Sequence, residues 1–347
     1  MTVRAAMGRR VRPALLEAGA KASLFVAPLN SAAVRTYGQA MDARGKKGDA
    51  RALMLLADRL SRRDGVAQSW LINDAVASRN APEVLRRYDA VLRTYPDDSS
   101  ALLTQLVSAL ASPQGRVALR PYMVATNPWR FSFLYAAVRT LPDSSLLADL
   151  LLYSPQLADT PDHREIATEL VSKLASQGHM NMLRSIYPRL PGTSAASLAS
   201  VKLDSTGITG YPPVTWSLAA SNDFGGALIE GEGGDSTEIE GFAMPSSGGV
   251  VLKKLAWLNP GNTQLRWSIT ERAPNPQSWA NWQIRCGARD DASIIAQSGN
   301  IFSAGTANNF TFAVPGQCPA VMIELKIAGG DGRDPSRIVL GNINLTR

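Results

Sequence analysis

A 34-residue spacing between candidate helix-capping residues is the feature that most restricts how this chain can fold. Asn30, Asp64 and Asp98 lie 34 residues apart, and each precedes a run with apolar residues at helical spacing. A short polar side chain at such a position accepts hydrogen bonds from the first free amides of a helix. Pro28 and Pro96 are two periods apart. A repeated helix pair buries its apolar face only against its neighbours. The spacing therefore predicts a stacked helical array.

The two clearest units, residues 31–64 and 65–98, resemble the tetratricopeptide repeat, a helix–turn–helix unit of this length. The positions that match its core are small, apolar, aromatic or proline residues: Gly38, Ala50, Met54, Ala57, Tyr88 and Pro96. Ile72, Val84 and Val91 depart from the pattern, because they stand where the family has small residues. The resemblance implies antiparallel helix pairs whose first helices line a concave surface for a protein partner.

Helix-length apolar runs continue beyond the repeats and are separated by prolines such as Pro113, Pro128, Pro142 and Pro155. We therefore assign residues 1–190 to a helical solenoid. A short apolar run ending at Pro28 has the position of the second helix of an earlier repeat, whose first helix is absent or atypical. Either the arginines of residues 4–12 form a basic cap at this end of the array, or upstream sequence is missing. The sequence contains no stretch with the length and apolarity of a signal peptide or a transmembrane helix.

Charge is distributed unevenly along the chain. Residues 1–190 contain 25 Lys and Arg against 16 Asp and Glu, a net charge of +9, whereas residues 191–347 contain 11 against 13, a net charge of −2. A basic half can attract nucleic acid, an anionic polymer or a membrane surface. The positive charge of residues 1–190 is also explained by arginines that lie on the outer, solvent-exposed surface of a helical array. We therefore expect no nucleic-acid partner.

The composition changes at Pro191, where a small, polar segment begins. We interpret residues 191–213 as a linker. From residue 214 the apolar residues alternate, and turns such as Asn259–Gly261 separate eight to ten short strands. This pattern predicts a β-sandwich, most simply a jelly roll, over residues 214–347. The predicted fold class is therefore an α-helical solenoid followed by a β-sandwich.

The predicted sandwich resembles the galactose-binding-like jelly rolls that serve as carbohydrate-binding modules. The segments that carry the resemblance are the turn at 258–261 and the strands at 265–269, 282–286, 310–312, 322–325 and 338–340. The order of solenoid and sandwich is similar to that of uncharacterised bacterial tetratricopeptide-repeat proteins associated with cell-envelope polysaccharide production. The resemblance implies polysaccharide binding and supplies no catalytic residue.

Four tryptophans lie close together in the predicted sandwich. Trp257 and Trp267 fall within strands, where a core position is the default. Trp279 and Trp282 flank the loop at 274–276 and are the candidate glycan-binding residues, because sugar rings stack on exposed aromatic faces. The alternative is that all four fill the core.

The chain has two cysteines, Cys286 and Cys318, both in the predicted sandwich. We expect one disulfide between them, and such bonds persist in oxidising compartments. An oxidised pair places the protein in the periplasm or cell envelope. Two separate thiols in a cytoplasmic protein are the alternative, because no signal peptide is visible.

Sequence motifs of catalysis are missing: there is no P-loop, no dinucleotide fingerprint, no nucleophile elbow and no zinc-protease motif. We therefore expect no catalytic, cofactor or metal site. The favoured function is a non-enzymatic scaffold that binds a protein partner through the solenoid and a polysaccharide through the sandwich. The alternatives are an adaptor whose sandwich binds only protein and a diverged glycan-active enzyme.

Overall fold

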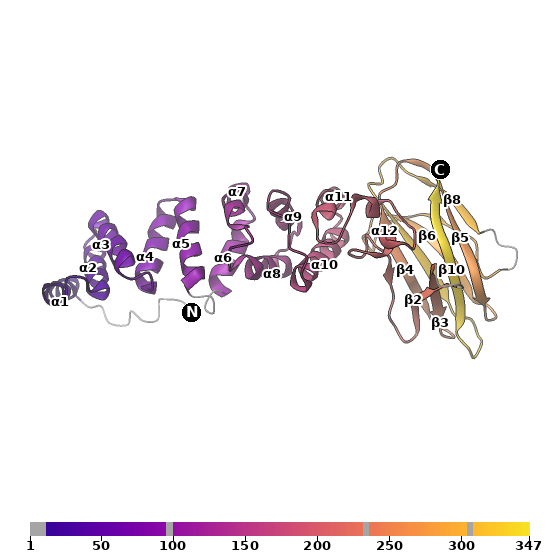
Figure 1. Ribbon diagram of the computed structural model, residues 1–347, viewed down its shortest axis with the longest axis horizontal. Coiled ribbons are helices and arrows are strands. Elements are labelled where there is room, and N and C mark those ends of the chain that lie inside the picture. The colour runs from indigo at the N-terminus through magenta and orange to yellow at the C-terminus, as the bar shows by residue number, and fades with distance from the viewer. Residues whose placement is uncertain (1–11, 95–99, 232–235, 304–307) are drawn as a thin grey trace. The chain divides into compact units, whose positions relative to one another are not determined.

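The computed structural model describes residues 12–94, 100–231, 236–303 and 308–347 (Figure 1). Its residues group into two compact units. The first extends to Tyr122 and includes Thr126–Phe133, and the second comprises Met123–Ala125 and Leu134–Arg347.

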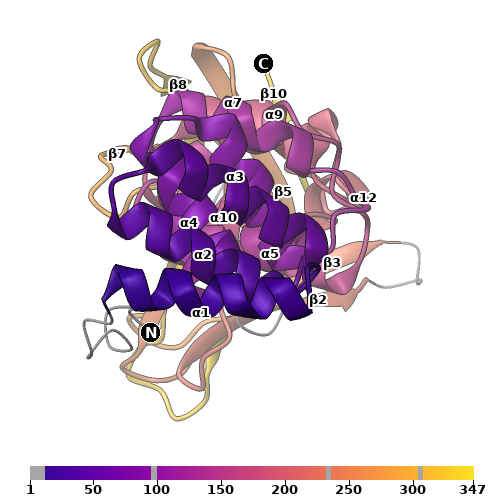
Figure 2. The ribbon, with the colours of Figure 1, turned by 90° about the vertical axis from the view of Figure 1, so that its left-hand side faces the viewer.

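The first unit is helical. Its helices are α1 (Pro13–Val26), α2 (Ser31–Ala43), α3 (Lys47–Leu60), α4 (Gly65–Ala77), α5 (Ala81–Thr94), α6 (Ser100–Ala109) and α7 (Pro113–Leu119), followed by the 3-10 turn η2 (Arg120–Tyr122). From α1 to α5 each helix packs on the next, and α1 and α2 lie side by side in Figure 2. The bounds of α2 and α3 recur in α4 and α5 after 34 residues (65 − 31, 77 − 43, 81 − 47 and 94 − 60).

The predicted capping residues explain where the helices of these pairs begin. The Asn30 side chain accepts hydrogen bonds from the amides of Ala32 and Ala33, which starts α2. Asp64 accepts one from the amide of Ala67 and starts α4, one period later. Asp98, the third residue of the series, lies outside the described residues.

The predicted repeat-core positions lie between the packed helices. Ala50, Met54 and Ala57 are fully buried on α3, and Tyr88 is 8% exposed on α5. A methyl group on Gly38 of α2 would lie 3.2 Å from Met54 Cε, so glycine permits the close approach of α2 and α3. Pro96 lies outside the described residues.

The second unit begins with further helices and ends with the strands. The helical elements are α8 (Arg130–Thr140), whose first turn belongs to the first unit, α9 (Ser145–Leu152), α10 (Pro161–Ser176), α11 (Met180–Ile186), η3 (Tyr187–Arg189), η4 (Ala195–Leu198) and α12 (Ser205–Ile208). The last two lie in the segment 191–213 that the sequence presents as a linker.

This segment is packed into the second unit. Val201 and Leu203 belong to the hydrophobic core of the sandwich, and the Trp216 indole N–H donates to the Val201 carbonyl at 3.0 Å. Tyr211 donates through its hydroxyl to the Pro191 carbonyl at 2.8 Å. The segment has the composition of a linker, but the few large side chains among its small polar residues pack into the second unit.

The strands form two antiparallel five-stranded sheets, which confirms the predicted β-sandwich. Sheet A has the order β1 (Ser217–Leu218), β4 (Gly248–Ala256), β9 (Val321–Ala328), β6 (Trp279–Cys286) and β7 (Ile294–Gln297). Sheet B has the order β2 (Phe224–Glu230), β3 (Thr237–Ala243), β10 (Ser336–Thr346), β5 (Gly261–Ala273) and β8 (Asn309–Val314). The chain passes repeatedly from one sheet to the other between β3 and β10, as in a jelly roll, and Figure 1 shows the two layers.

The core lies between the sheets. Leu252, Leu325 and Trp282 form one row across β4, β9 and β6, and all three are fully buried. Sheet B contributes residues such as Ile239 and Leu340 to the same cluster. Large apolar side chains on alternate positions thus point inward, and the positions between them point outward.

Lys254 on β4 is a charged residue with no exposed surface. Its ammonium group donates to the carbonyls of Ser197 and Val214, which binds the 191–216 segment to the sheet. Burial lowers the pKa of Lys254 to about 7, because the charged form loses its hydration.

We expect this lysine to make stability depend on pH. Its pKa is about 7 in the folded protein and about 10.4 in an unfolded chain, so between these values the unfolded state binds more protons. The free energy of unfolding should then rise with pH across this window, by at most about 1.4 kcal/mol per pH unit, and stay flat below it. Urea unfolding of Lys254→Met at pH 7–9.5 should lack this rise.

The exposed neighbour Lys253 supplies the control, since Lys253→Met should keep the pH dependence of the wild type. Equal slopes for Lys254→Met and the wild type would contradict the assignment of the effect to Lys254.

Candidate functional site

Trp279 and Trp282, the two predicted glycan-binding residues, lie on opposite faces of β6. Trp282 is fully buried, with its ring centroid 5.9 Å from that of Trp267 and 6.3 Å from that of Trp216. Trp279 is 38% exposed at the start of the strand. The prediction is therefore wrong for Trp282, which is a core residue. Trp257 and Trp267 are also buried, as expected for core positions.

The reason for the error is the period of a β-strand. Side chains alternate between the faces, so two residues three positions apart cannot share a face. In the run Trp279–Arg285, the apolar residues at 280, 282 and 284 belong to the core between the sheets, so the positions 279, 281, 283 and 285 point to the other face. This alternation is visible in the sequence and would have separated the two tryptophans.

The outward positions continue across sheet A as a polar row. One row of this face crosses all five strands in the order β1, β4, β9, β6 and β7, and each of its residues is paired with the next: Ser217, Lys253, Glu324, Gln283 and Gln297. Asn281 and Lys326 form the neighbouring pair, and Trp279 pairs with Ala328 one step further. We call this surface the outer face of sheet A.

Three side-chain oxygens on the outer face lack hydrogen-bond donors. Asn281 Oδ1, Gln283 Oε1 and Glu324 Oε2 are buried and have no partner among the described residues. The three side chains are 4–7% exposed. The other Glu324 oxygen lies 3.6 Å from an Arg285 nitrogen. A buried acceptor without a donor costs about 1–3 kcal/mol, so each of these oxygens favours any donor that can reach it.

Trp279 lies at the end of the outer face, next to loops that main-chain hydrogen bonds hold together. The Pro276 carbonyl accepts from the Asp331 amide at 3.0 Å, and the Ser246 amide donates to the Gly330 carbonyl at 3.3 Å. A methyl group on Gly330 would lie 1.7 Å from the Pro276 oxygen, so only glycine fits there. These main-chain contacts hold the loops next to Trp279 in place.

The predicted disulfide is confirmed. Cys286 at the end of β6 and Cys318 in the turn before β9 are bonded, with their Cα atoms 5.4 Å apart. The Gly287 amide also donates to the Ala320 carbonyl at 2.9 Å, so the bond joins two segments that already touch.

Within the described residues, no three or more His, Cys, Asp or Glu side chains gather in a way that could hold a metal ion. The same part of the chain contains no helix with the length and apolarity needed to cross a membrane.

No family profile and no curated protein matches this chain. Among solved structures, one from work on the promiscuous specificity of carbohydrate-binding modules of the β-sandwich superfamily is 15% identical. That alignment covers 38% of this chain and 57% of the other, with a TM-score of 0.28. A structure described as CBM4 structure and function is 11% identical over 37% of this chain and 77% of its own, with a TM-score of 0.23.

A third structure contains accessory secretory proteins 1, 2 and 3 of Streptococcus pneumoniae, at 15% identity over 39% of this chain and 98% of the other, with a TM-score of 0.26. This chain thus spans little more than half the length of the first structure. Carbohydrate-binding-module β-sandwiches are therefore among the structures to which the C-terminal part of this chain is similar.

Proposed function

We propose that the protein is a non-enzymatic scaffold that binds a polysaccharide on the outer face of sheet A and a protein partner through its tetratricopeptide-like helices. The observation that carries the glycan proposal is the set of unpartnered acceptors on Asn281, Gln283 and Glu324 beside half-exposed Trp279.

The chemistry of this face suits a sugar ring. Hydroxyl groups supply the donors that the three oxygens lack, and amide side chains such as those of Asn281 and Gln283 also offer donors to hydroxyl oxygens. An indole ring provides a flat apolar surface for the C–H groups of a sugar. Trp279 stands at the end of the polar row, so one chain of sugar units can contact both.

We also propose that the protein works in an oxidising compartment, in cell-envelope or exopolysaccharide biology. The Cys286–Cys318 bond supports this, because disulfides persist in the periplasm and outside the cell. The resemblance in domain order to polysaccharide-associated proteins points in the same direction.

Glycan binding should depend on Trp279. We expect the full chain to bind at least one polysaccharide on a glycan array and Trp279→Ala to weaken that binding by about 1–3 kcal/mol, as for an aromatic anchor. Isothermal titration calorimetry with the best array ligand measures the loss. The melting temperature should change little, because the ring is 38% exposed.

Leu228→Ala is the matched control, since Leu228 is an equally exposed apolar residue (41%) on β2 of the other sheet. It should leave the affinity unchanged. Binding that survives Trp279→Ala would place the glycan elsewhere. Binding of protein but of no glycan would favour the adaptor, and turnover of a polysaccharide would favour an enzyme.

A further inference from the structure

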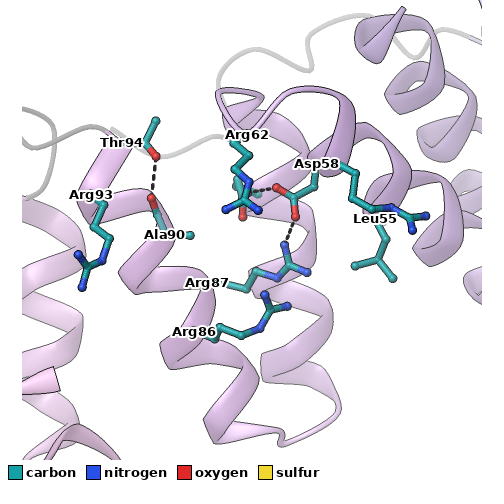
Figure 3. A pocket seen from close by; sticks show the side chains of 10 residues that line it. Leu55, Asp58, Arg62, Arg86, Arg87, Ala90, Arg93 and Thr94 are labelled. Atoms are coloured by element: carbon teal, nitrogen blue, oxygen red, sulfur yellow. Dashed lines mark hydrogen bonds and ion pairs between the residues drawn. The ribbon is translucent and has the colours of Figure 1, made fainter. Parts of the chain in front are cut away.

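An arginine-rich pocket of about 460 Å³ lies between α3, α4 and α5 of the first unit. Figure 3 shows the side chains that line it, with Arg87 bound to the Asp58 carboxylate and with Arg62 and Arg86 among the other lining residues. Arg59 and Arg93 also line the pocket and occupy equivalent positions of the two repeats (93 − 59 = 34). We call it the arginine pocket.

Three of the five arginines already have carboxylate partners. Arg87 is 2% exposed and contacts both Asp58 and Glu83, with Glu83 Oε1 at 2.8 Å from its Nε. Arg86 binds Glu83 at 2.7 Å, and Arg93 binds Asp89 at 2.9 Å. Hydrogen bonds from Arg86, with Arg87 adding to them, lower the pKa of Glu83 to about 2, so this carboxylate is ionised at neutral pH.

Arg59 and Arg62 remain. Both are exposed, and neither has a hydrogen bond or an ion pair within the described part of the chain. Five arginines line the pocket, and Asp58, Glu83 and Asp89 together neutralise three of their positive charges. The net charge is therefore +2 (5 − 3), which equals the charge of the Arg59 and Arg62 guanidinium groups. The pocket is therefore an anion-attracting site whose inner arginines are held in place by carboxylates.

Gln68 on α4 gives a second, independent indication of a ligand. It lines the pocket and is 3% exposed, and its amide nitrogen donates to Asp58. Its Oε1 is buried and has no donor among the residues that the structure describes. A ligand that carries an N–H group beside its anionic groups satisfies this oxygen, and the main chain of a peptide is such a ligand.

We propose that the arginine pocket binds a carboxylate-bearing side chain of an acidic peptide segment in a protein partner. The two free guanidinium forks match carboxylates in bidentate geometry. Leu55 and Ala90 give the pocket apolar walls that suit the methylene groups of Asp and Glu side chains. The inference rests on the proposed partner binding by the helices and names its chemistry. It places the arginines of the contact on and just after the second helices α3 and α5, whereas the family resemblance favours the first helices, of which α4 contributes Gln68.

The test uses the full chain and a fluorescent peptide of about ten residues rich in Asp and Glu, followed by fluorescence anisotropy. We expect binding that Arg59→Gln combined with Arg62→Gln weakens at least about tenfold, since charge-assisted hydrogen bonds are the strong ones. The same peptide with Asn and Gln in place of Asp and Glu should not bind. Circular dichroism should show that the double variant keeps its helices.

Arg51→Gln combined with Arg79→Gln is the matched control. It removes the same charge from the same unit, and neither residue lines the arginine pocket. This control should bind the acidic peptide within about twofold of the wild type.

Three results would overturn the proposal. One is an equal loss in both double variants, which means unspecific charge attraction. Another is equal or tighter binding of an oligogalacturonate that competes for Arg59 and Arg62, which assigns the pocket to an anionic glycan. The third is that a protein partner binds Arg59→Gln/Arg62→Gln as tightly as the wild type. The helices would then still bind a partner, but not through the arginine pocket.

Discussion

Met54→Asp is expected to unfold the first compact unit. Met54 is fully buried on α3 and packs in one cluster with Val34, Ala57 and Leu71 from three helices. A carboxylate there has no partner, and it either loses its hydration or must take up a proton, at a cost of several kcal/mol. Because a whole domain is stable by only about 5–15 kcal/mol, most of this unit's stability should be lost. Thermal melting followed by circular dichroism at 222 nm should show the helical transition shifted strongly downward.

Leu56→Asp is the control on the same helix, two residues further along. Leu56 is 38% exposed, so its carboxylate stays hydrated and the change should cost about 0.5 kcal/mol or less. A melting curve of Met54→Asp that coincides with that of Leu56→Asp would contradict the packing of α3.

Trp282→Ala should lower the stability of the sandwich by about 3–5 kcal/mol, the usual cost of deleting a buried aromatic side chain. The indole is fully buried and contacts Trp216 and Trp267, so its removal leaves a cavity at the centre of the core. Urea unfolding followed by tryptophan fluorescence measures the loss.

Trp279→Ala is the matched comparison, since it removes the same side chain three residues away on the same strand. We expect it to cost less than about 1 kcal/mol, because the ring is half-exposed. Equal losses in the two variants would mean that Trp279 is also a core residue and would weaken the glycan proposal.

The helices of the first unit could be predicted because their signals are local. Asn30 and Asp64 cap helices through amides two or three residues away, and Gly38 and Met54 meet across one short turn between adjacent helices. Such contacts depend on residues close in sequence, so a period of 34 is enough to place the helices. The sandwich is predictable for a similar reason, since alternation is a property of each strand by itself.

The candidate glycan face could be predicted only in part. Alternation along β6 places Trp279, Asn281 and Gln283 on one side, which the sequence by itself determined. That Glu324 lies beside Gln283, and Lys253 beside Glu324, follows from the strand order β4–β9–β6, in which strands distant in the sequence are neighbours. Sheet order depends on the packing of the whole core, and no local pattern encodes it.

The same division holds for the charged groups. The sequence by itself determined a basic helical half and a pair of cysteines in the strand-rich half. Only the tertiary structure decided that Arg87 is buried between two carboxylates while Arg59 and Arg62 have no partner in the described part of the chain, and that Lys254 is buried while Lys253 is exposed. The physical reason is that the state of a charged side chain depends on its hydration and on its partners in space. Residues far apart in the sequence supply those partners, and they come together only when the chain is folded.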